Sequence, residues 1–518
     1  MSSTFSRLYA AQPHHLTGKI ITVEIDITRG LHSFNIVGLP DKAVEEARDR
    51  VGSAIKNSGF KSPKQKNEKL IVSLAPAEVK KEGAYFDLAI ALGYLLSTHD
   101  IAFDPAKKLF VGELSLNGDV LPVRGMLPIA QAARDAGYSE LFVPQKNASE
   151  AALIPELTIY PVKTLHDVVQ HLDDNLIDTD PETGAAIRGE QITPQPPTKI
   201  SVEKETSFAD FSDVKGQESA KRGLEIAAAG RHNVAMYGPP GTGKTMLARA
   251  FSGILPALHS DAMLDVTSIH SIAGTSNRMI ITQPTFRSPH HTSSYVSVIG
   301  GGAHPKPGEV TLAHHGILFL DEFPEFDKRV IESLRQPLED RIVQISRASG
   351  TAQFPADFIL IAAMNPCPCG YRGSRTKRCQ CTPGAIERYK RKMSGPIMDR
   401  IDIWLEVEHI EYEKLSDKDF PKGEPSEHIN ERVIDARSTQ WNRQGKHNAQ
   451  LSAKDMESIQ LSDEVQNILN QSAKKLALSP RAYHRVIKLA RTIADLDHAS
   501  TIAENHILEA LQYRPKIN

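Results

Sequence analysis

The sequence predicts an α/β multidomain fold with an α+β segment first, an α/β core around a phosphate-binding loop, and a C-terminal helical lid. Three patterns predict this organisation. Apolar and polar residues alternate over 20–27, which is typical of a strand with one buried face. A strand, a glycine-rich turn and a helix follow one another over 233–251. Apolar residues recur at helical spacing over 480–493.

Length and composition predict a soluble chain of about three domains. The 518 residues carry a net charge of −2 and 40% hydrophobic residues, so any basic surface must be local and balanced elsewhere. No stretch approaches the roughly 18 consecutive apolar residues of a membrane span. The first residues also lack the apolar centre of a signal peptide. We therefore expect a cytoplasmic protein without a membrane contact.

Shifts in composition divide the chain into four segments. We predict an α+β domain over 1–170, a linker over 171–206, an α/β core that contains the glycine-rich turn over 207–424 and a helical lid over 425–518. The linker is acidic at first and proline-rich later, and such a composition cannot bury a core. We expect it to be a mobile, partly extended connector.

The glycine-rich turn matches the spacing of a phosphate-binding loop. Its glycines let backbone N–H groups point at phosphate oxygens, and the helix that follows adds a partial positive charge. Lys244 is expected to reach the terminal phosphates, and the Thr245 hydroxyl to take a Mg²⁺ position. The order of strand, loop and helix argues against a chance turn, so ATP and Mg²⁺ are predicted. The loop residues are Gly238, Pro239, Pro240, Gly241, Thr242, Gly243, Lys244 and Thr245.

A second apolar strand over 317–320 ends in two acidic residues. In α/β sheets, ligands bind at the carboxyl edge of the parallel strands. Asp321 is therefore expected to hold Mg²⁺, directly or through water, and Glu322 to act as general base on the attacking water. Together with the loop, these acids predict a site for ATP hydrolysis.

Several further segments resemble the AAA+ ATPases. The residues over 208–217 are similar to the opening segment that lies beside adenine, and Asn365, at the end of an apolar strand, resembles the sensor asparagine that contacts the γ-phosphate or the water. A simple strand-end cap is the alternative for Asn365. Arg481, at the start of a lid helix, resembles the second sensor arginine.

The segment over 394–402 resembles one that delivers an arginine into the neighbouring subunit's site in magnesium-chelatase and minichromosome-maintenance ATPases. This resemblance implies that Arg400 is an arginine finger, with Arg335 as a rival. A surface ion pair is the alternative for both arginines. Such a finger contributes on the order of 10³–10⁵ in rate.

The long stretch between the loop and Asp321 resembles the insertion of chelatase-like AAA+ proteins that projects towards a ring's central pore. A hairpin over 340–350 is expected to be a pore loop, with Arg341, Arg347 and Lys306 as candidate contacts to a nucleic-acid strand. Two pairs of adjacent histidines, 290–291 and 314–315, raise a metal alternative. Neighbouring residues of a strand point to opposite faces, which argues against it.

The four cysteines are clustered, which fits a metal knuckle better than a disulfide framework. Four thiolates can complete a closed tetrahedral Zn²⁺ site. The C-x-C spacing within each pair is tighter than the common one, so unmetallated thiols and a redox role stay open. The cysteines are Cys367, Cys369, Cys379 and Cys381.

The same region is locally basic. Residues 371–400 contain nine Arg or Lys against Glu387 and Asp399. Such a stretch is suited to a phosphate backbone, and a solvated surface is the alternative.

The first domain resembles the Lon-type protease fold of the ribosomal-protein-like superfamily. The motifs over 81–87 and 112–125 carry this resemblance. In the proteases a serine nucleophile follows the first motif's glycine, whereas here Tyr85 or its neighbours occupy that position. No lysine base occurs between Arg124 and Tyr138. Because a nucleophile without a base cannot be activated, we expect a catalytically inactive domain.

Taken together, these motifs identify the chain as a member of the bacterial ComM/YifB family of magnesium-chelatase-like AAA+ ATPases. The resemblance implies a homo-hexameric ring acting on single-stranded or branched DNA, as a branch-migration helicase in homologous recombination and natural transformation. It also implies recombination proteins as partners. The alternative is an ATP-driven chelatase-like subunit that remodels a protein partner.

Overall fold

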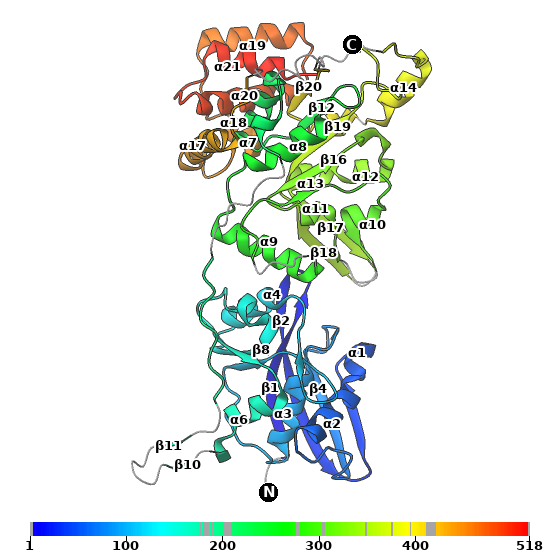
Figure 1. Cartoon of the computed structure of the whole chain (residues 1–518), viewed down its shortest axis with the longest axis vertical. Helices are drawn as coiled ribbons and strands as arrows, with labels where there is room; N and C mark the ends of the chain where they lie inside the picture. The colour runs from blue at the N-terminus through cyan, green and yellow to red at the C-terminus, as the bar shows by residue number, and fades with distance from the viewer. Residues whose placement is uncertain are drawn as a thin grey trace. The chain divides into compact units, whose positions relative to one another are not determined.

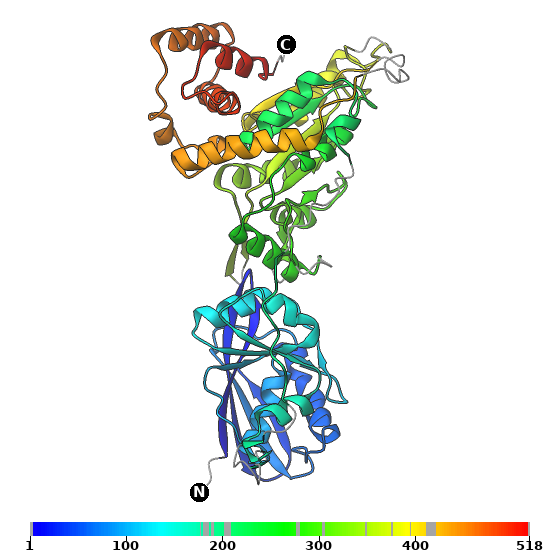
Figure 2. The ribbon, with the colours of Figure 1, turned by 60° about the vertical axis from the view of Figure 1, so that its left-hand side comes forward.

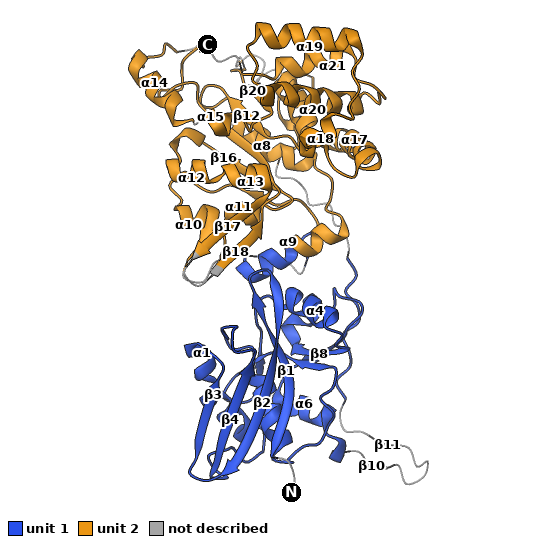
Figure 3. Ribbon diagram, turned by 180° about the vertical axis from the view of Figure 1, so that it is seen from behind, with its two compact units in different colours: residues 1–201, 267–281 blue, residues 202–266, 282–518 orange. Residues whose placement is uncertain are grey.

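The computed structural model describes residues 4–176, 178–179, 186–187, 191–200, 209–275, 280–302, 306–347, 350–373, 377–393, 395–410 and 421–515. The chain forms two compact units (Figure 1, Figure 3). The first unit comprises 1–201 and 267–281, and the second comprises 202–266 and 282–518. Among the helices within the described ranges, none combines the length and apolar composition needed to cross a bilayer.

The first unit is built on two sheets. Its strands are β1 (Phe5–His14), β2 (Thr17–Arg29), β3 (Ser33–Val37), β4 (Glu68–Ala75), β5 (Lys108–Phe110), β6 (Glu113–Leu114), β7 (Val120–Leu121), β8 (Glu140–Pro144), β9 (Thr158–Val162), β10 (Asp178–Thr179) and β11 (Ala186–Ile187). Its helices are α1 (Lys42–Glu45), α2 (Ala47–Asn57), α3 (Asp87–Ser97), α4 (Met126–Asp135), α5 (Ala148–Ala151) and α6 (Leu165–Leu172).

The larger sheet of this unit has the order β1-β2-β4-β3, and the smaller, parallel sheet has the order β5-β8-β9. Strand β2 alternates as predicted, with Ile21, Val23 and Ile25 fully buried. Helix α3 is nearly all apolar and nearly all buried, because it lies against both β1 and β2.

One local prediction is confirmed only in part. The apolar stretches over 109–114 and 118–123 predict one hairpin, and β6 does pair with β7, but Leu109 pairs with Leu141 of β8 in the parallel sheet. The antiparallel pairing is confined to the short strands β6 and β7. Non-local pairing with β8 decides the partner, and no local pattern reports it.

Two segments outside 1–170 belong to the first unit. The Thr198 hydroxyl donates to the Ser149 carbonyl at 2.7 Å, so the last described part of the predicted linker lies along this unit. Ser271, far along the chain, donates to Glu150 at 2.5 Å and accepts from the Gly125 N–H at 3.1 Å. The rest of the predicted linker is largely outside the described residues.

The second unit contains a five-stranded parallel sheet with the order β13-β16-β19-β12-β20, which confirms the predicted α/β core. These strands are β12 (Val234–Tyr237), β13 (Phe286–Arg287), β16 (Ile317–Leu320), β19 (Ile359–Met364) and β20 (Ile403–Glu406). Two antiparallel pairs accompany it, β14 (Gly300–Gly301) with β15 (Lys306–Pro307) and β17 (Ile342–Arg347) with β18 (Gly350–Pro355).

Helices surround this sheet and continue into a C-terminal helical region. They are α7 (Glu218–Gly230), α8 (Lys244–Gly253), α10 (Tyr295–Ile299), α11 (Glu309–Leu312), α12 (Lys328–Ser333), α13 (Arg335–Asp340), α14 (Pro383–Lys392), α15 (Gly395–Met398), α17 (Ser426–Gln444), α18 (Ala453–Met456), α19 (Asp463–Lys475), α20 (Pro480–Leu496) and α21 (Glu504–Gln512). Helix α9 (Ser260–Ala273) has residues in both units. The long helix α17 packs against α7 and α8, as Figure 2 shows.

One hydrophobic core joins the sheet to the C-terminal helices. It runs from Val234 and Ile361 in the sheet, through Phe251 of α8, to Val433 of α17 and Ile493 of α20. Protein interiors are close-packed, so a displacement of one packed element is transmitted to its neighbours. A shift of the C-terminal helices is therefore mechanically linked to α8.

Candidate nucleotide site and cysteine cluster

The glycine-rich loop joins the end of β12 to the start of α8, and close packing explains its first glycine. A Cβ on Gly238 would lie 2.1 Å from the carbonyl oxygen of Val407, the residue after β20, so a side chain cannot be accommodated. Gly241 and Gly243 have φ values of +78° and +91°, which L-residues rarely adopt. The loop therefore curls tightly and presents its backbone to one side, as phosphate binding requires.

Lys244 is held at the centre of the loop. Its Nζ donates to the carbonyl oxygens of Gly238 and Pro239, both at 2.8 Å, and lies 3.4 Å from Oδ1 of Asn365. Burial lowers the pKa of Lys244 from its ordinary value. The structure thus brings the predicted phosphate-binding lysine and the predicted sensor asparagine together.

Thr245 and Asp321 are adjacent although they lie 76 positions apart in the sequence. The Thr245 hydroxyl donates to Oδ2 of Asp321 at 2.9 Å. A hydroxyl and a carboxylate facing one cavity fit Mg²⁺, which takes oxygen ligands and usually combines one or two protein ligands with waters and substrate phosphates. These two residues would hold the ion, and their assignment stays a prediction.

Glu322 follows in a left-handed conformation with φ of +52°, and its N–H donates to Oδ1 of Asp321 at 2.9 Å. Its side chain is half exposed and lines the same cavity, which has a volume of about 670 Å³. The lining residues are Pro240, Gly241, Thr242, Gly243, Lys244, Thr245, Ser288, Pro289, His290, His291, Asp321, Glu322 and Asn365. One cavity therefore collects residues 240–245 of the predicted loop, both acids and the predicted sensor.

The cavity also contains a segment that the sequence argument assigned elsewhere. Ser288, Pro289, His290 and His291 belong to the stretch interpreted as a pore-directed insertion, yet they line the nucleotide cavity. The histidines lie in a loop between β13 and α10, so their rings are 4.2 Å apart instead of on opposite faces of a strand. The proline followed by two histidines could have indicated a loop at this point. The alternation of side chains along a strand does not apply there.

The second histidine pair does not suit a metal. Asp265, His314 and His315 have ligand atoms within 4.8 Å of one another. However, Nδ1 of His314 accepts the Asp357 N–H at 3.0 Å, so the neutral ring carries its proton on Nε2 and offers no second lone pair. Burial lowers the pKa of His314 to about 3. The two histidines instead lie beside Asp357, which pairs with Arg231 at 3.2 Å.

The three residues predicted to contact a nucleic-acid strand lie in different environments. Arg341 lies 3.5 Å from the Asp357 carboxylate, so its charge is already paired. Lys306, in β15, is exposed. The side chain of Arg347 lies outside the described residues.

Arg400 and Arg481 meet on one carboxylate outside the nucleotide cavity. Arg400 is largely buried, pairs with Glu339 and donates to the Pro396 carbonyl at 2.5 Å. Arg481 is exposed and lies 3.7 Å from the same Glu339. Arg335 pairs with Glu332. Neither Arg400 nor Arg481 is among the residues that line the cavity of their own chain.

The four cysteines gather immediately beyond Asn365. The sulfur atoms of Cys367 and Cys369 lie 3.4 Å apart, and that of Cys379 lies 3.7 and 3.5 Å from them. Together with Cys381, all four sulfurs lie within 4.8 Å of one another. A tetrahedral site with Zn–S bonds of about 2.3 Å has S···S distances of about 3.8 Å. The cluster therefore fits a metal ion of this kind.

The cysteines of the cluster differ in their pKa shifts. The N–H groups of Tyr371 and Gln380 donate to Cys369 and lower its pKa to about 6. At Cys379 and Cys381 the backbone contacts act in the same direction, but burial and the neighbouring sulfur atoms outweigh them and raise the pKa. Because thiolates are the metal ligands, the backbone prepares Cys369 in particular for binding a metal.

The cysteine cluster also touches the phosphate-binding loop. A Cβ on Gly370 would lie 2.6 Å from Cδ of Pro240, so only glycine fits between the two segments. The Tyr389 hydroxyl, from α14, donates to the Asn365 carbonyl at 3.1 Å. The cluster, α14, Asn365 and the loop therefore form one packed assembly.

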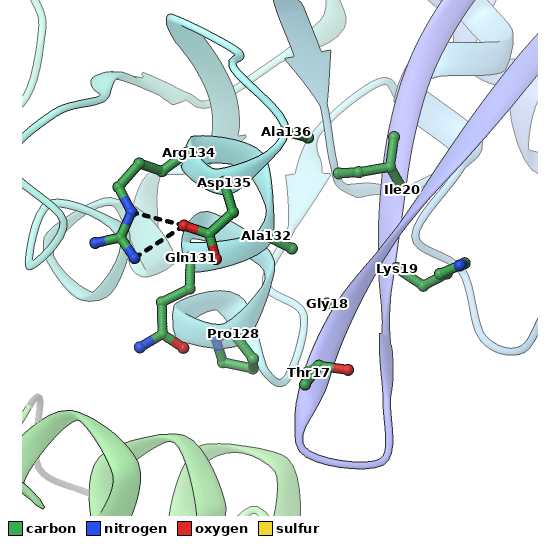
Figure 4. Close-up of a pocket in the computed structure, with 10 residues that line it drawn as sticks. All are labelled: Thr17, Gly18, Lys19, Ile20, Pro128, Gln131, Ala132, Arg134, Asp135 and Ala136. Carbon is green, nitrogen blue, oxygen red and sulfur yellow. Dashed lines mark hydrogen bonds and ion pairs between the residues drawn. The ribbon is translucent and has the colours of Figure 1, made fainter. Parts of the chain in front are cut away.

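The first unit has a separate shallow pocket of about 600 Å³ between the β1–β2 hairpin and α4 (Figure 4). Its charged residues Arg134 and Asp135 pair with each other at 3.0 Å, and the Thr17 hydroxyl donates to the His14 carbonyl.

At the position expected for a protease nucleophile, burial raises the pKa of Tyr85 to about 12. The neighbouring Lys81 is buried and donates to the Pro76 carbonyl.

Comparison with known proteins agrees with these features. The family model "Magnesium chelatase, subunit ChlI" matches residues 210–415, "Subunit ChlI of Mg-chelatase" matches 23–147, and "Magnesium chelatase, subunit ChlI C-terminal" matches 423–514. The chain is 40% identical to "Competence protein ComM" of Haemophilus influenzae over 519 residues, covering 98% of this chain and 97% of that protein.

The chain belongs to the magnesium-chelatase-like AAA+ family of ComM and YifB. The similarity to "Uncharacterized protein YifB" of Escherichia coli is 39% identity over 498 residues, covering 95% of this chain and 94% of that protein. Membership in this family makes the chain an ATPase that uses ATP with Mg²⁺. The predicted family is therefore confirmed.

The likeness to Lon is partial. "Lon protease 2" of Bacillus subtilis is 29% identical over 181 residues, covering 30% of this chain and 33% of that protein. The Lon-like architecture of the first unit stays a proposal, and so does the absence of proteolysis.

The contact between Gly370 and Pro240 predicts that a side chain at Gly370 weakens ATP binding. Overpacking of this kind costs about 1–3 kcal/mol, and about 1.4 kcal/mol corresponds to tenfold in affinity. Titration with a fluorescent ATP analogue should show Gly370→Val raising the Kd by about tenfold. Gly373→Val is the matched control, because Gly373 has a similar φ of +78° but open space around its Cα. Equal shifts in both variants would contradict the proposed contact.

Proposed function

We propose that this chain is a homo-hexameric AAA+ motor that drives branch migration of DNA during homologous recombination. The observation that carries the proposal is the single assembly in which Lys244, Asp321, Glu322 and Asn365 share one cavity and continue into a basic helix. The similarity to the competence protein ComM supports a role in natural transformation, with recombination proteins as partners.

The residues divide the hydrolysis chemistry among them. Lys244 binds the β- and γ-phosphates, and Asn365 orients the γ-phosphate or the water. Glu322 accepts the proton of the attacking water at a carboxylate oxygen. Thr245 and Asp321 would hold Mg²⁺, and the ion would neutralise charge that develops on the phosphate oxygens.

Arg400 is proposed to act in the site of the neighbouring subunit. In its own chain it is paired with Glu339 and lies outside the nucleotide cavity, which is compatible with such a role. Arg481 is exposed beside the same carboxylate, as the proposed second sensor in the lid. The pair on Glu339 would then link the position of the lid to that of the finger.

The proposed DNA surface lies on α14 and the loop before it. Arg372, Lys377, Arg378 and Arg388 are exposed there. Arg391 and Lys392 are exposed as well but have acidic partners, Glu387 and Glu325. Because the phosphate backbone dominates non-specific affinity, binding to such a surface is salt-dependent and tolerant of sequence. Since α14 bonds Asn365 through Tyr389, a strand on this surface would be coupled to the hydrolysis site.

A chelatase-like subunit that remodels a protein partner is the second candidate, because the matching family models are those of magnesium chelatase. The two candidates differ in what stimulates ATP hydrolysis. DNA stimulates a DNA motor, whereas a remodelling subunit responds to its protein partner.

ATP-driven branch migration on three- and four-stranded junctions tests the motor. We expect activity from the unmodified protein and at least a hundredfold loss in Glu322→Gln, since removing a general base costs about 10²–10⁴ in rate. ATP binding should persist in that variant. Absence of DNA binding at low salt in the unmodified protein would refute the motor and favour the remodelling subunit.

A mixing experiment tests Arg400. Arg400→Ala and Lys244→Ala subunits are each expected to be inactive alone. When mixed, some sites should combine an intact loop with an intact finger, so the ATPase rate should exceed the average of the two pure preparations. A mixture that matches the average would show that Arg400 does not act across an interface.

The cysteine cluster is proposed to hold one Zn²⁺ per chain. Elemental analysis of the purified protein should give about one zinc per chain, as four thiolates complete one site. Cys381→Ser should lose most of that zinc, whereas Ser374→Ala, outside the ligand set, should keep it. A zinc-free protein with four reactive thiols would refute the site.

A further inference from the structure

The carboxylate of the proposed general base has a partner that the sequence argument did not assign. Nδ1 of His291 lies 3.1 Å from Oε2 of Glu322. This is the side-chain partner that the described residues offer to the Glu322 carboxylate. The nearby Thr245 hydroxyl donates to Asp321 instead. Half of the Glu322 side chain is exposed, so little else restricts where its carboxylate points.

The loop that carries His291 is anchored on both sides. Before it, Arg287 of β13 makes a two-pronged ion pair with Glu309, at 2.6 and 2.8 Å. After it, the Ser294 side chain accepts the Ser297 N–H and caps α10. Within the loop, Nδ1 of His290 lies 2.8 Å from the Thr292 hydroxyl. The position of His291 is therefore set by the fold rather than by chance contact with Glu322.

The His291 ring is also held in orientation. The His290 ring lies 4.2 Å away, and the Phe326 ring approaches at 6.5 Å with its plane nearly perpendicular. Phe326 follows Glu322 closely in sequence, so the ring packs against the same segment whose carboxylate it contacts. A ring fixed in this way presents Nδ1 in one direction.

Glu322 needs such a constraint. Its backbone is left-handed at the end of β16, and a glutamate side chain has three rotatable bonds that sample many rotamers when exposed. A general base is effective only when one oxygen lies within hydrogen-bond reach of the water. A partner that holds the other oxygen reduces the sampled positions to those near the phosphate-binding loop.

We propose that His291 is a positioning residue for Glu322: its Nδ1–H holds Oε2 of the glutamate so that the second carboxylate oxygen faces the attacking water. The inference rests on the proposed role of Glu322 in ATP hydrolysis. It needs a ring held by the loop and a proton on Nδ1, and an ionised carboxylate 3.1 Å away favours that proton because it can only accept. It also makes the 288–292 segment part of the hydrolysis site, directly before α10 and the glycine pair of β14.

Two substitutions separate the donor from the packing. His291→Phe keeps a flat ring but removes the N–H. His291→Asn loses the ring but places an amide N–H the same number of bonds from the backbone as Nδ1. Tyr295→Phe is the control, because Tyr295 is exposed on α10, does not line the cavity, and loses one polar group in the same way.

Steady-state ATPase assays on the full-length protein test the proposal. His291→Phe should lower kcat on the order of tenfold, as misplacement of a catalytic group does, while KM and the Kd for a fluorescent ATP analogue change less than twofold. His291→Asn should restore kcat to within about threefold of the unmodified protein, and Tyr295→Phe should leave it unchanged. In the Glu322→Gln background, His291→Phe should cause no further loss, because residues that act as a unit are non-additive.

Three results would overturn the proposal. An unchanged kcat in His291→Phe would mean that His291 does not position the base. A raised kcat would mean that His291 restrains the base. Equal losses in His291→Phe and His291→Asn would show that an N–H restored at this position does not support Glu322. Additive losses with Glu322→Gln would show that the two residues act separately. If the unmodified protein hydrolysed no ATP, the proposed function itself would fail, which is a distinct outcome.

Discussion

The parallel arrangement of β12, β16 and β19 is the constraint on which the nucleotide site depends. Carboxyl ends of adjacent parallel strands meet at one edge of the sheet, which is where ligands bind in such folds. The phosphate-binding loop, Asp321 and Asn365 follow these three strands, and residues 240–245 of the loop line one cavity with Asp321 and Asn365. The close approach of Gly238 to the Val407 carbonyl then fixes the loop against β20. Without this packing, Lys244 would not be held in a fixed position relative to Asp321 and Glu322.

From this edge, short contacts spread outward to the regions that would bind macromolecules. The cysteine cluster reaches the loop through Gly370 and Pro240, and α14 reaches Asn365 through the Tyr389 hydroxyl. The 288–292 segment reaches Glu322 through His291 and continues into α10 and the β14–β15 hairpin. The C-terminal helices share one hydrophobic core with the sheet. A change at the γ-phosphate therefore has several rigid routes away from the cavity, all within the second unit.

Local sequence predicted much of this site because its chemistry depends on short spacings. The loop over 238–245, the acidic pair after 317–320 and Asn365 after its strand are each readable within a few residues. The position of the loop with His290 and His291 was not predicted in this way, because the adjacent histidines were assigned strand geometry and a location near a pore. In the structure they lie in a loop anchored by Arg287 and Glu309, a pairing between residues far enough apart that no local pattern reports it. The pairing of β5 with β8 was missed for the same reason.

The sequence by itself determined the nucleotide chemistry, the family and the clustering of four cysteines, because each is written in residues close together in the chain. Tertiary structure alone decided which residues meet across long separations. It brought His291 to Glu322, Gly370 to Pro240, and both Arg400 and Arg481 to Glu339. It also assigned residues 267–281 to the first unit. Such contacts depend on how packed elements fill space together, and this information is distributed over the whole chain.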